Sequence, residues 1–401
     1  MSARVIDEPD LLRGYDPFAE DVIADPYPWY RMLLAEGGAH RSAARDVWVL
    51  SRYDDVREAA RSHESLSSAE GVAYQRIPLP MMLTSDQPGH TRLRRMVSRD
   101  FTTRAVARWE PVVRTLVDEA VDRMLDLGSF DLVEELAGPL PISVIAEVLG
   151  IPTADRDRFR RWSDAIVEGF RLTERIDAQS DAVSTVIAGV SELYAYLADA
   201  FAERAAQPRD DLLSRLMELE GGERLGEVEL FWFCLLLLVA GNETTTNLIG
   251  NTVLALFEHP DQWVRLREEP GAVAATVEES LRFGSPVQGF FRTARRPYAV
   301  GETTIPEGDR VLLLFAAANR DPAHYRDPDR FDVSRNPVDH LAFGSGIHAC
   351  LGSHLARLEM ATVLDVLRAR VRDLLPDGPV VRTRNPMLRG VALLPVRLVP
   401  A

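Results

Sequence analysis

The stretch "AFGSGIHACLGSHLAR", residues 342–357, holds one of only two cysteines in the 401-residue chain. A disulfide at Cys350 could be made only with Cys234, which lies inside the apolar run "LFWFCLLLLVAG" and has no other feature beside it. Free cysteines are common as small core residues, so Cys234 is interpreted as part of the core. For Cys350 the choice is between an inert buried thiol and a ligand held in a built site.

The residues around Cys350 favour a ligand. Downstream, apolar residues recur at spacings of four and three, which predicts a long helix that begins within a residue or two of the cysteine: Ala356, Met360, Val363, Leu367 and Val371. The partial positive charge and free amides of a helix N-terminus stabilise a thiolate over a thiol. Upstream, Gly344 and Gly346 permit positive φ angles, so the backbone can lie close against a large flat molecule.

Composition indicates a protein with a large core. With 46% hydrophobic residues and no repeat or Ser/Gly-rich linker, the chain is predicted to form a single domain over residues 1–401. A helix-rich part is expected over about 86–285, and a β-containing part with the cysteine loop over about 286–401. The fold class is therefore mainly α with small β-sheets.

Charge and hydropathy exclude several classes of partner. The net charge of -15 argues against nucleic acid, because phosphate binding needs a positive surface. The N-terminus has no apolar signal core, and the longest strongly apolar run covers about 11 residues, short of the ~20 needed to span a bilayer. Two cysteines are typical of a reducing compartment. We therefore expect a cytoplasmic protein with no membrane attachment.

Periodicity places the elements along the chain. "DVWVLSRY", residues 46–53, predicts a short strand, and residues 105–258 predict successive helices. After residue 290 the pattern changes. "YAVGETTIPEGDRVLLLF" predicts a strand, a glycine-marked turn and a second strand, and "GVALLPVRLV" at residues 390–399 predicts another.

The loop "FGSGIHACLG", residues 343–352, resembles the cysteine-ligand loop of the cytochrome P-450 family at every position that defines it. The resemblance implies a bacterial haem-thiolate monooxygenase, with haem b between this loop and a long central helix. It implies that Cys350 ligates the haem iron, that Phe343 packs beside the sulfur and that His348 reaches a propionate. The loop residues that it places against the cofactor are Phe343, Gly344, His348, Cys350 and Gly352. Thiolate ligation pushes electron density onto iron and favours O–O cleavage.

A second motif, "LVAGNETTTN" at residues 238–247, lies in a helix predicted from about Glu227 to Phe257. It resembles the family's helix on the oxygen side of the haem, where the small Ala240 leaves room for dioxygen. The resemblance implies that Glu243 and Thr244 form the acid and alcohol pair that delivers protons. Local opening of the helix is expected, because hydroxyls compete for backbone carbonyls. Without the cysteine loop, threonines that merely cap or pack would be the simpler interpretation.

The segment "EESLR", residues 278–282, allows two pairings. Glu278 and Arg282 form an ordinary i, i+4 surface pair, worth about 0.3–0.5 kcal/mol. The family's Glu-x-x-Arg pair selects Glu279 and Arg282 instead. In "DPDRFDVSR", Arg330 matches the family's third position best, with Arg335 as the alternative. A buried arginine and carboxylate form a rigid bidentate pair, whose expected role is to brace the cysteine loop.

A fourth motif lies in "DQPGHTRLRRMVSRDF", residues 86–101. His90 and Arg94 are four residues apart and share a helix face. They resemble the family's propionate clamp, and Arg292 in "FFRTA" occupies the family's other propionate position. Haem propionates are carboxylates, so a histidine and arginines are chemically fitting partners. A solvated surface arginine is the alternative for each.

Three arginines of the same segment are predicted to point elsewhere. At ~100° per residue, Arg92, Arg95 and Arg99 fall on a face roughly opposite to the clamp. We hypothesise that they dock an acidic redox partner such as a ferredoxin, with steering that weakens at high salt. A solvated charged face without a partner is the alternative.

The substrate is expected to be a small hydrophobic molecule, because the predicted pocket walls are mainly apolar. The residues assigned to those walls are Leu236, Val239, Val287 and Phe290. A carboxylated substrate would need a basic residue in the loop at residues 67–83, where only Arg76 is available. The expected reaction is insertion of one atom of dioxygen by hydroxylation or oxidative dealkylation.

The chain lacks a G-x-G-x-x-G turn and has too few cysteines for an iron–sulfur cluster. Electrons are therefore expected from NAD(P)H through a separate reductase and ferredoxin. The protein is expected to be a monomer. Two other functions remain open: a peroxide-driven oxygenase of the same fold, against which Glu243 and Thr244 count, and a non-catalytic haem-binding sensor or carrier.

Overall fold

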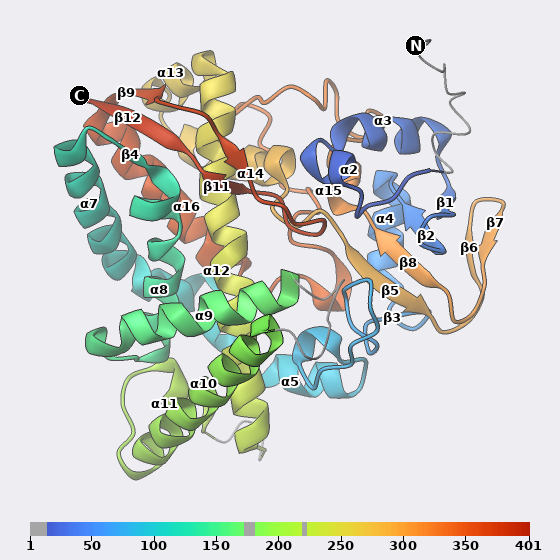
Figure 1. Ribbon diagram of the computed structural model, residues 1–401, viewed down its shortest axis with the longest axis horizontal. Helices are drawn as coiled ribbons and strands as arrows, with labels where there is room; N and C mark the ends of the chain where they lie inside the picture. The colour runs from blue at the N-terminus through green and yellow to red at the C-terminus, as the bar shows by residue number, and fades with distance from the viewer. Residues whose placement is uncertain (1–13, 172–180, 219–222) are drawn as a thin grey trace.

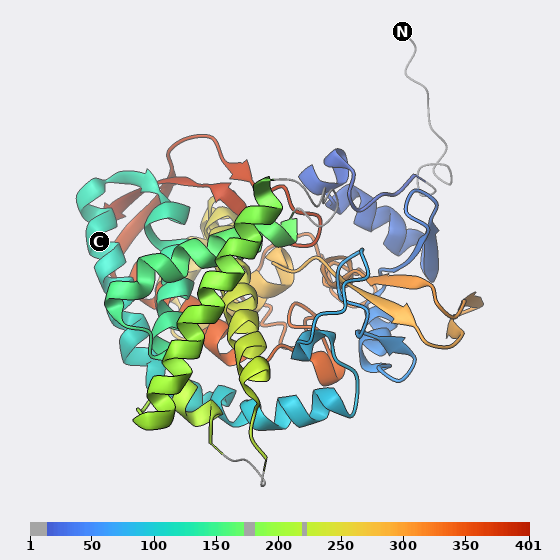
Figure 2. The same ribbon diagram turned by 60° about the horizontal axis from the view of Figure 1, so that its bottom comes forward.

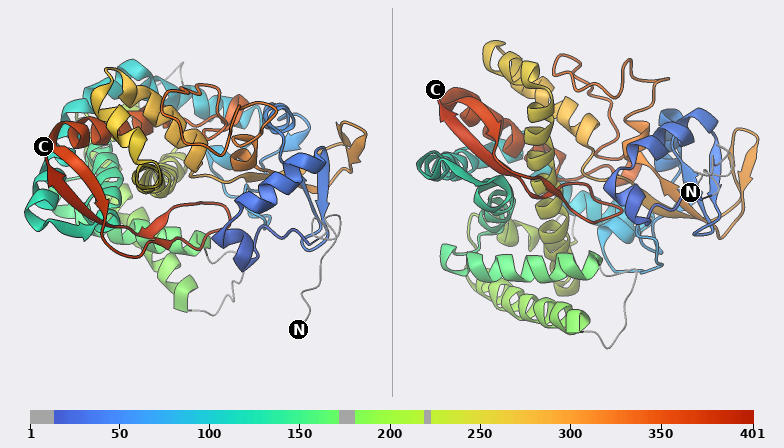
Figure 3. Two further views of the ribbon diagram at one scale, coloured as in Figure 1. Left: turned by 90° about the horizontal axis from the view of Figure 1, so that it is seen from above. Right: turned by 45° about the horizontal axis from the view of Figure 1, so that its top comes forward.

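The computed structural model describes residues 14–171, 181–218 and 223–401. Helices occupy one side of the molecule, and the N-terminal helices and the largest sheet occupy the other (Figure 1). Helix α12, Glu227–Glu258, runs through the middle and matches the helix predicted over about 227–257. In the left view of Figure 3, α12 is seen close to end-on among the other helices.

The helical side is built from segments whose apolar residues recur with helical spacing, as the sequence predicts. Helices α9 and α10 lie side by side and cross the central helix (Figure 2). The helices of this side are α5 (Gly89–Ser98), α6 (Thr103–Val106), α7 (Glu110–Leu127), α8 (Pro139–Leu149), α9 (Arg156–Arg171), α10 (Asp181–Ala206), α11 (Leu212–Leu216), α13 (Pro260–Glu268), α14 (Ala272–Gly284) and α16 (Ser353–Arg370).

Helix α12 is the core of this arrangement. It contacts α8, α14 and α16, and its buried side chains lie on several faces. Among the helices of the described ranges, it is the one long and apolar enough to cross a membrane, so the expectation that no such segment exists was too strict. Half of its most apolar window is buried inside the protein, and helices surround it. That burial is typical of the core helix of a soluble protein.

The opposite side carries a five-stranded sheet of order β1-β2-β8-β5-β3. In this sheet β2 and β8 pair in parallel, and the other neighbouring strands pair antiparallel. Strand β8 is buried along its whole length. The strands are β1 (Ala39–Ser42), β2 (Val47–Leu50), β3 (Leu66–Ser67), β5 (Phe290–Ala294) and β8 (Arg310–Leu313). The helices α2 (Glu20–Ala24), α3 (Tyr27–Glu36), α4 (Tyr53–Arg61) and α15 (Phe315–Ala318) lie around this sheet.

Three small sheets complete the fold. The predicted strand-turn-strand after residue 290 forms the hairpin of β6 (Tyr298–Val300) and β7 (Thr303–Ile305), followed by β8. The single strand predicted at residues 390–399 is two strands in the structure, β11 and most of β12, which belong to different sheets. The remaining strands are β4 (Ser129–Asp131), β9 (Val371–Pro376), β10 (Val381–Arg382), β11 (Val391–Leu393) and β12 (Pro395–Pro400). The mainly α architecture with small sheets is thus confirmed.

Candidate functional site

A cavity of about 220 Å³ lies between α12 and the cysteine loop. Cys350, with the loop from Phe343 to Gly352, lines one side of it. Residues of α5, β5, α14 and α16 close the edges. Segments that are far apart in the sequence therefore converge on one space, and the motifs singled out from the sequence contribute to it.

The loop before Cys350 has the shape that its glycines permit. Gly344 and Gly346 have φ angles of 68° and 75°, and a Cβ on Gly346 would lie 2.8 Å from the carbonyl oxygen of Ala60. The loop therefore passes close to the end of α4, as only glycine allows. The Cys350 amide donates to the carbonyl of Phe343 over 2.9 Å, which closes the loop under the cavity.

The predicted helix is present as α16, which begins at Ser353, three residues after Cys350, with Gly352 as its N-cap. The thiol of Cys350 is accessible through the cavity, while protein surrounds it on its other sides. Burial raises the pKa of Cys350, and the amides of Gly352 and Ser353 oppose this shift, as does the charge of Arg94. The helix N-terminus thus acts in the predicted direction, but burial outweighs it.

His90, Arg94, Arg292 and His348 all line one edge of the cavity. The imidazoles of His90 and His348 lie 4.4 Å apart between ring centroids. Burial and then the nearby cations lower the pKa of His348 to about 3, and burial lowers the pKa of Arg292 to about 10. Each shift shows that positive charge is costly at this edge unless an anion compensates it.

The same edge has unused hydrogen-bonding capacity. The buried Nε2 of His348 has no hydrogen-bond partner among the described residues. Arg292 donates to the carbonyl of Phe291 over 2.8 Å, and within the described ranges neither it nor Arg94 forms an ion pair. Buried polar groups in folded proteins are nearly always satisfied. The edge therefore fits a bound group that carries carboxylates, as the two propionates of haem do.

Helix α12 forms an apolar wall opposite the cysteine. Its lining residues follow helical spacing on one face: Phe233, Leu236, Leu237, Ala240, Gly241, Thr244, Thr245 and Leu248. The Thr244 hydroxyl donates to the Ala240 carbonyl over 2.7 Å, yet α12 remains one continuous α-helix, so the expected local opening is absent. Glu243 is half-buried and does not line the cavity, although it adjoins Thr244.

The predicted substrate wall needs one correction. Leu236, Val287 and Phe290 line the cavity, but Val239 does not. At ~100° per residue, Val239 lies outside the arc that faces the cavity and packs against the hydrophobic core instead. Leu237, which the sequence interpretation passed over, takes its place in the wall.

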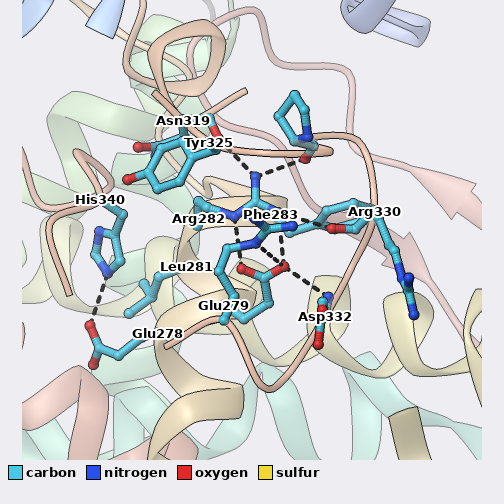
Figure 4. Close-up of polar contacts among 12 residues, drawn as sticks. Glu278, Glu279, Leu281, Arg282, Phe283, Asn319, Tyr325, Arg330, Asp332 and His340 are labelled. Atoms are coloured by element: carbon cyan, nitrogen blue, oxygen red, sulfur yellow. Dashed lines mark hydrogen bonds and ion pairs between the residues drawn. The ribbon is translucent and has the colours of Figure 1, made fainter. Parts of the chain in front are cut away.

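The Glu-x-x-Arg pair is formed by Glu279 and Arg282, both fully buried (Figure 4). The Arg282 Nε and Nη2 donate to the two Glu279 carboxylate oxygens over 2.7 and 2.8 Å. The choice of Arg330 as the third member is wrong. Arg330 contributes its carbonyl oxygen, 3.1 Å from Arg282 Nη2, while its exposed side chain points away. The side chain that reaches Glu279 Oε1, at 3.4 Å, belongs to the alternative, Arg335.

This buried pair is connected to the cysteine loop through the intervening chain. Arg282 Nη1 donates to the carbonyls of Asn319 and Pro328 over 2.9 and 2.8 Å. The Asn319 side chain accepts a hydrogen bond of 2.7 Å from the Leu341 amide, two residues before Phe343. A bidentate buried pair thus holds the segment that leads into the loop.

The arginines hypothesised to dock a redox partner do not line the cavity, but they do not form a free basic surface either. Arg92 binds Glu229 over 2.6 Å and Glu223 over 3.2 Å, and Arg95 binds Glu223 over 3.3 Å. Arg99 binds Glu218 over 3.2 Å and also contacts Asp100. The segment at the start of α12 lies beside α5 and supplies acidic partners. These ion pairs compensate part of the charge on which docking of an acidic redox partner would depend, and the docking hypothesis stays a prediction.

The positions of two buried acids were missed from the sequence. Glu359 on α16 is 2% exposed and lines the cavity, and its Oε2 has no hydrogen-bond partner among the described residues. Burial raises the pKa of Glu359 to about 8. A single acid on an apolar helix face was the available signal. Glu278 was considered only as a possible surface partner of Arg282, but it is buried and binds Arg357 and His340 instead.

Comparison with known proteins agrees with this geometry. The family model described as Cytochrome P450 matches residues 40–367. "Beta-dihydromenaquinone-9 omega-hydroxylase" of Mycobacterium tuberculosis is 41% identical over 391 residues, which cover 97% of this chain and 79% of that protein. "Cytochrome P450 monooxygenase PikC" of Streptomyces venezuelae is 41% identical over 399 residues, which cover 94% of this chain and 92% of PikC.

Solved structures show the same likeness. Cytochrome P450 CYP109Q5 from Chondromyces apiculatus superposes with a TM-score of 0.88 and 35% identity, covering 97% of this chain and 99% of that one. The chain therefore belongs to the cytochrome P450 family. Membership makes it an oxidoreductase of the monooxygenase type, a class that uses haem and dioxygen.

Proposed function

We propose that this protein inserts one atom of dioxygen into a small hydrophobic substrate, by hydroxylation or oxidative dealkylation. The observation that carries the proposal is the cavity between Cys350 and the apolar face of α12. Bound haem supplies the activation of dioxygen in this family of enzymes. The protein supplies the ligand for the iron, the anchoring of the cofactor, an apolar space for substrate and a hydroxyl that handles protons.

Cys350 is the proposed metal ligand, and His90, Arg94, Arg292 and His348 are the proposed anchors for the carboxylates of haem b. Charge-assisted hydrogen bonds of this kind are about twice as strong as neutral ones. They would satisfy the His348 Nε2 atom that otherwise lacks a partner. Phe343, Gly344 and Gly352 shape the loop, and the small side chain of Ala240 leaves space between α12 and the proposed cofactor.

Thr244 is the proposed alcohol of the reaction. Its hydroxyl donates to the Ala240 carbonyl, so the hydroxyl oxygen can still accept a hydrogen bond from a group in the cavity. Glu243 beside it is the proposed acid that exchanges protons with solvent. The apolar side chains of α12 and β5 exclude bulk water from the same space, which limits loss of protons to solvent.

The substrate is proposed to be hydrophobic and without a charge that must be paired. Leu236, Val287 and Phe290 line the cavity, and the cations at its edge belong to the proposed cofactor anchor. Arg76, the basic residue considered for a carboxylated substrate, binds Glu70 and the Gly308 carbonyl and does not line the cavity. A hydrophobic substrate therefore agrees with the described walls.

A ferredoxin with an NAD(P)H-dependent reductase is the proposed electron source, and a cytoplasmic monomer the proposed form. Sequence supports the separate carriers, because the chain has no dinucleotide-binding glycine motif of its own. The ion pairs of Arg92, Arg95 and Arg99 within the chain make these residues weaker candidates for docking, since each pair already compensates charge.

The test is product formation under three conditions: with NAD(P)H, reductase and ferredoxin; with peroxide alone; and with neither. Substrates would be chosen from terpenoid, aromatic and macrolide-like compounds that displace iron-bound water, which is detected by absorption spectroscopy. We expect turnover with the carriers. Turnover with peroxide alone would indicate a peroxide-driven oxygenase, and ligand binding without turnover under any condition would indicate a sensor or carrier.

A further inference from the structure

The aromatic ring of Phe343, in the cysteine loop, is contacted by two basic side chains. The Arg357 guanidinium carbon lies 4.6 Å from the centroid of the Phe343 ring. The His340 imidazole lies 5.6 Å from it between centroids, tilted by 50°. Arg357 comes from the second turn of α16, and His340 comes from the segment that leads into the loop. A cation over an aromatic face at this distance is attractive.

Both basic side chains bind one carboxylate, Glu278 on α14. Arg357 Nε donates to Glu278 Oε1 over 2.6 Å, and Arg357 Nη2 donates to Oε2 over 2.9 Å. His340 Nε2 lies 3.1 Å from Oε2, a contact that is drawn in Figure 4. The Ala342 amide donates to His340 Nδ1 over 3.2 Å, which makes Nε2 the nitrogen that donates to Glu278.

The surroundings of Glu278 favour its ionised carboxylate over the neutral carboxyl. Glu278 is 8% exposed, and its burial alone would raise the pKa of the carboxyl. The hydrogen bonds from Arg357 and His340, together with the charge of Arg357, outweigh burial and lower the pKa of Glu278 to about 2. A bidentate arginine pair is also geometrically strict, because its two parallel hydrogen bonds fix the guanidinium plane. Glu278 therefore fixes where the positive charge of Arg357 lies.

Phe343 and Arg357 are both connected to Cys350. The Phe343 carbonyl accepts the hydrogen bond from the Cys350 amide over 2.9 Å. Arg357 lies on the helix that begins three residues after the cysteine, and its guanidinium lies over the Phe343 ring of the cysteine loop. By contrast, Glu279, the next residue on α14, makes its contacts with Arg282, Asp332 and Arg335.

We propose that Glu278 is a positioning residue for the cysteine ligand: it holds Arg357 and His340 against Phe343, and so fixes both the loop and the positive charge beside Cys350. The inference rests on the proposed role of Cys350 as the metal ligand. Removing the Glu278 charge frees Arg357 and leaves a net gain of positive charge near the haem site. Positive charge favours the reduced, less positive state of a metal centre, so the reduction potential should rise.

The test compares holoenzymes of Glu278→Gln, Glu278→Asp and a matched control, Glu269→Gln. Glu269 also binds an arginine, Arg265, over 2.7 Å, but it is exposed at the end of α13. At equal haem content we would measure the midpoint potential and the absorption of the reduced carbon monoxide complex. Glu278→Gln should shift the potential upward and lose part of the thiolate-type band. Glu278→Asp should restore most of both, and Glu269→Gln should change neither.

A Glu278→Gln holoenzyme with the wild-type potential and band would overturn the inference, even if its thermal stability fell, because a purely structural brace changes stability alone. If Glu278→Gln does not fold, Arg357→Lys keeps the charge without the bidentate geometry. Because the net charge is unchanged, it should leave the midpoint potential near the wild-type value but lose part of the thiolate-type band, and a wild-type band would again overturn the inference. A wild-type protein without a thiolate-type band would instead contradict the proposed function itself.

Discussion

The two sides of the cavity are built on different principles. On the cysteine side, polar groups are held in fixed networks: Glu279 with Arg282, and Glu278 with Arg357. On the α12 side, the wall is apolar apart from a few hydroxyls such as Thr244. Hydrogen bonds and ion pairs have strict geometry, whereas apolar contacts depend mainly on area. The cysteine side therefore specifies one cofactor, and the α12 side specifies only that its ligand is hydrophobic.

The largest expected effect comes from breaking the buried network on the cysteine side. Arg282→Met leaves the Glu279 carboxylate without its bidentate partner in a fully buried site. Breaking such a pair by removing one member typically costs about 3–5 kcal/mol in the free energy of unfolding, because a buried charge is left uncompensated. Urea unfolding would measure it, with the exposed Arg326→Met as the control. A loss below about 1 kcal/mol would contradict a structural role.

The second prediction concerns Glu359, an acid that lines the cavity from α16. Its pKa is raised from 4.5 to about 8, so the folded protein keeps the carboxyl neutral. Its contribution to stability is full below the unfolded pKa and is lost as pH rises through the folded pKa, by up to about 1.4 kcal/mol per pH unit.

Glu359→Gln removes this titration, so the variant should gain stability relative to wild type as pH increases from 5 to 8. Unfolding curves at several pH values would measure the difference. A stability difference that is constant over this range would show that Glu359 ionises normally in the folded protein.

The third prediction concerns the polar edge of the cavity. Arg292→Leu should weaken retention of haem by roughly 10- to 100-fold, since a hydrogen bond to a charged group is worth about 1.5–3 kcal/mol. Transfer of haem to an acceptor protein would give the rate of loss. Arg95→Leu is the matched control, because Arg95 is an arginine that does not line the cavity. Equal rates in the two variants would contradict the proposed anchor.

The smallest expected effect lies on the apolar side. Leu236→Ala should weaken binding of a hydrophobic ligand by at most about 2 kcal/mol, from the lost apolar contact area, whereas Val239→Ala should leave binding unchanged. The measurement is a spectral titration with a compound that binds the wild type. If the Val239 variant lost more affinity than the Leu236 variant, the helix would face the cavity differently from the structure.

On the cysteine side, the sequence predicted the ligand, its loop and the following helix, but not which side chains form the buried ion pairs. Cys350, the glycine loop and the start of α16 follow from local rules of helix spacing and glycine conformation, which act over a few residues. The choice between Arg330 and Arg335 did not, because both lie in an irregular segment without a period that says which side chain turns inward. Helical spacing alone was equally consistent with an exposed Glu278, because its partners His340 and Arg357 come from other elements.

Ion pairs between residues far apart in the chain could not be predicted either, because the fold brings the partners together from different elements. The acidic partners of Arg92 and Arg95 lie more than 120 residues further along the chain, so the number of cations on α5 said nothing of their compensation. On the α12 side, the long helix and its apolar character were predicted correctly. The error at Val239 was one of rotation about the helix axis, which a short motif does not determine.

Ligation of the iron by Cys350 is tested most directly by the absorption spectrum of the reduced protein with carbon monoxide, recorded for the wild type, Cys350→Ala and Cys234→Ala. Cys234 is the matched control, since it is the other cysteine and is buried in the core. If Cys350 ligates the iron, the wild type and Cys234→Ala should show a thiolate-type band, and Cys350→Ala should lose it. A Cys350→Ala protein that bound haem and kept the thiolate-type band would contradict the assignment of Cys350 as the ligand.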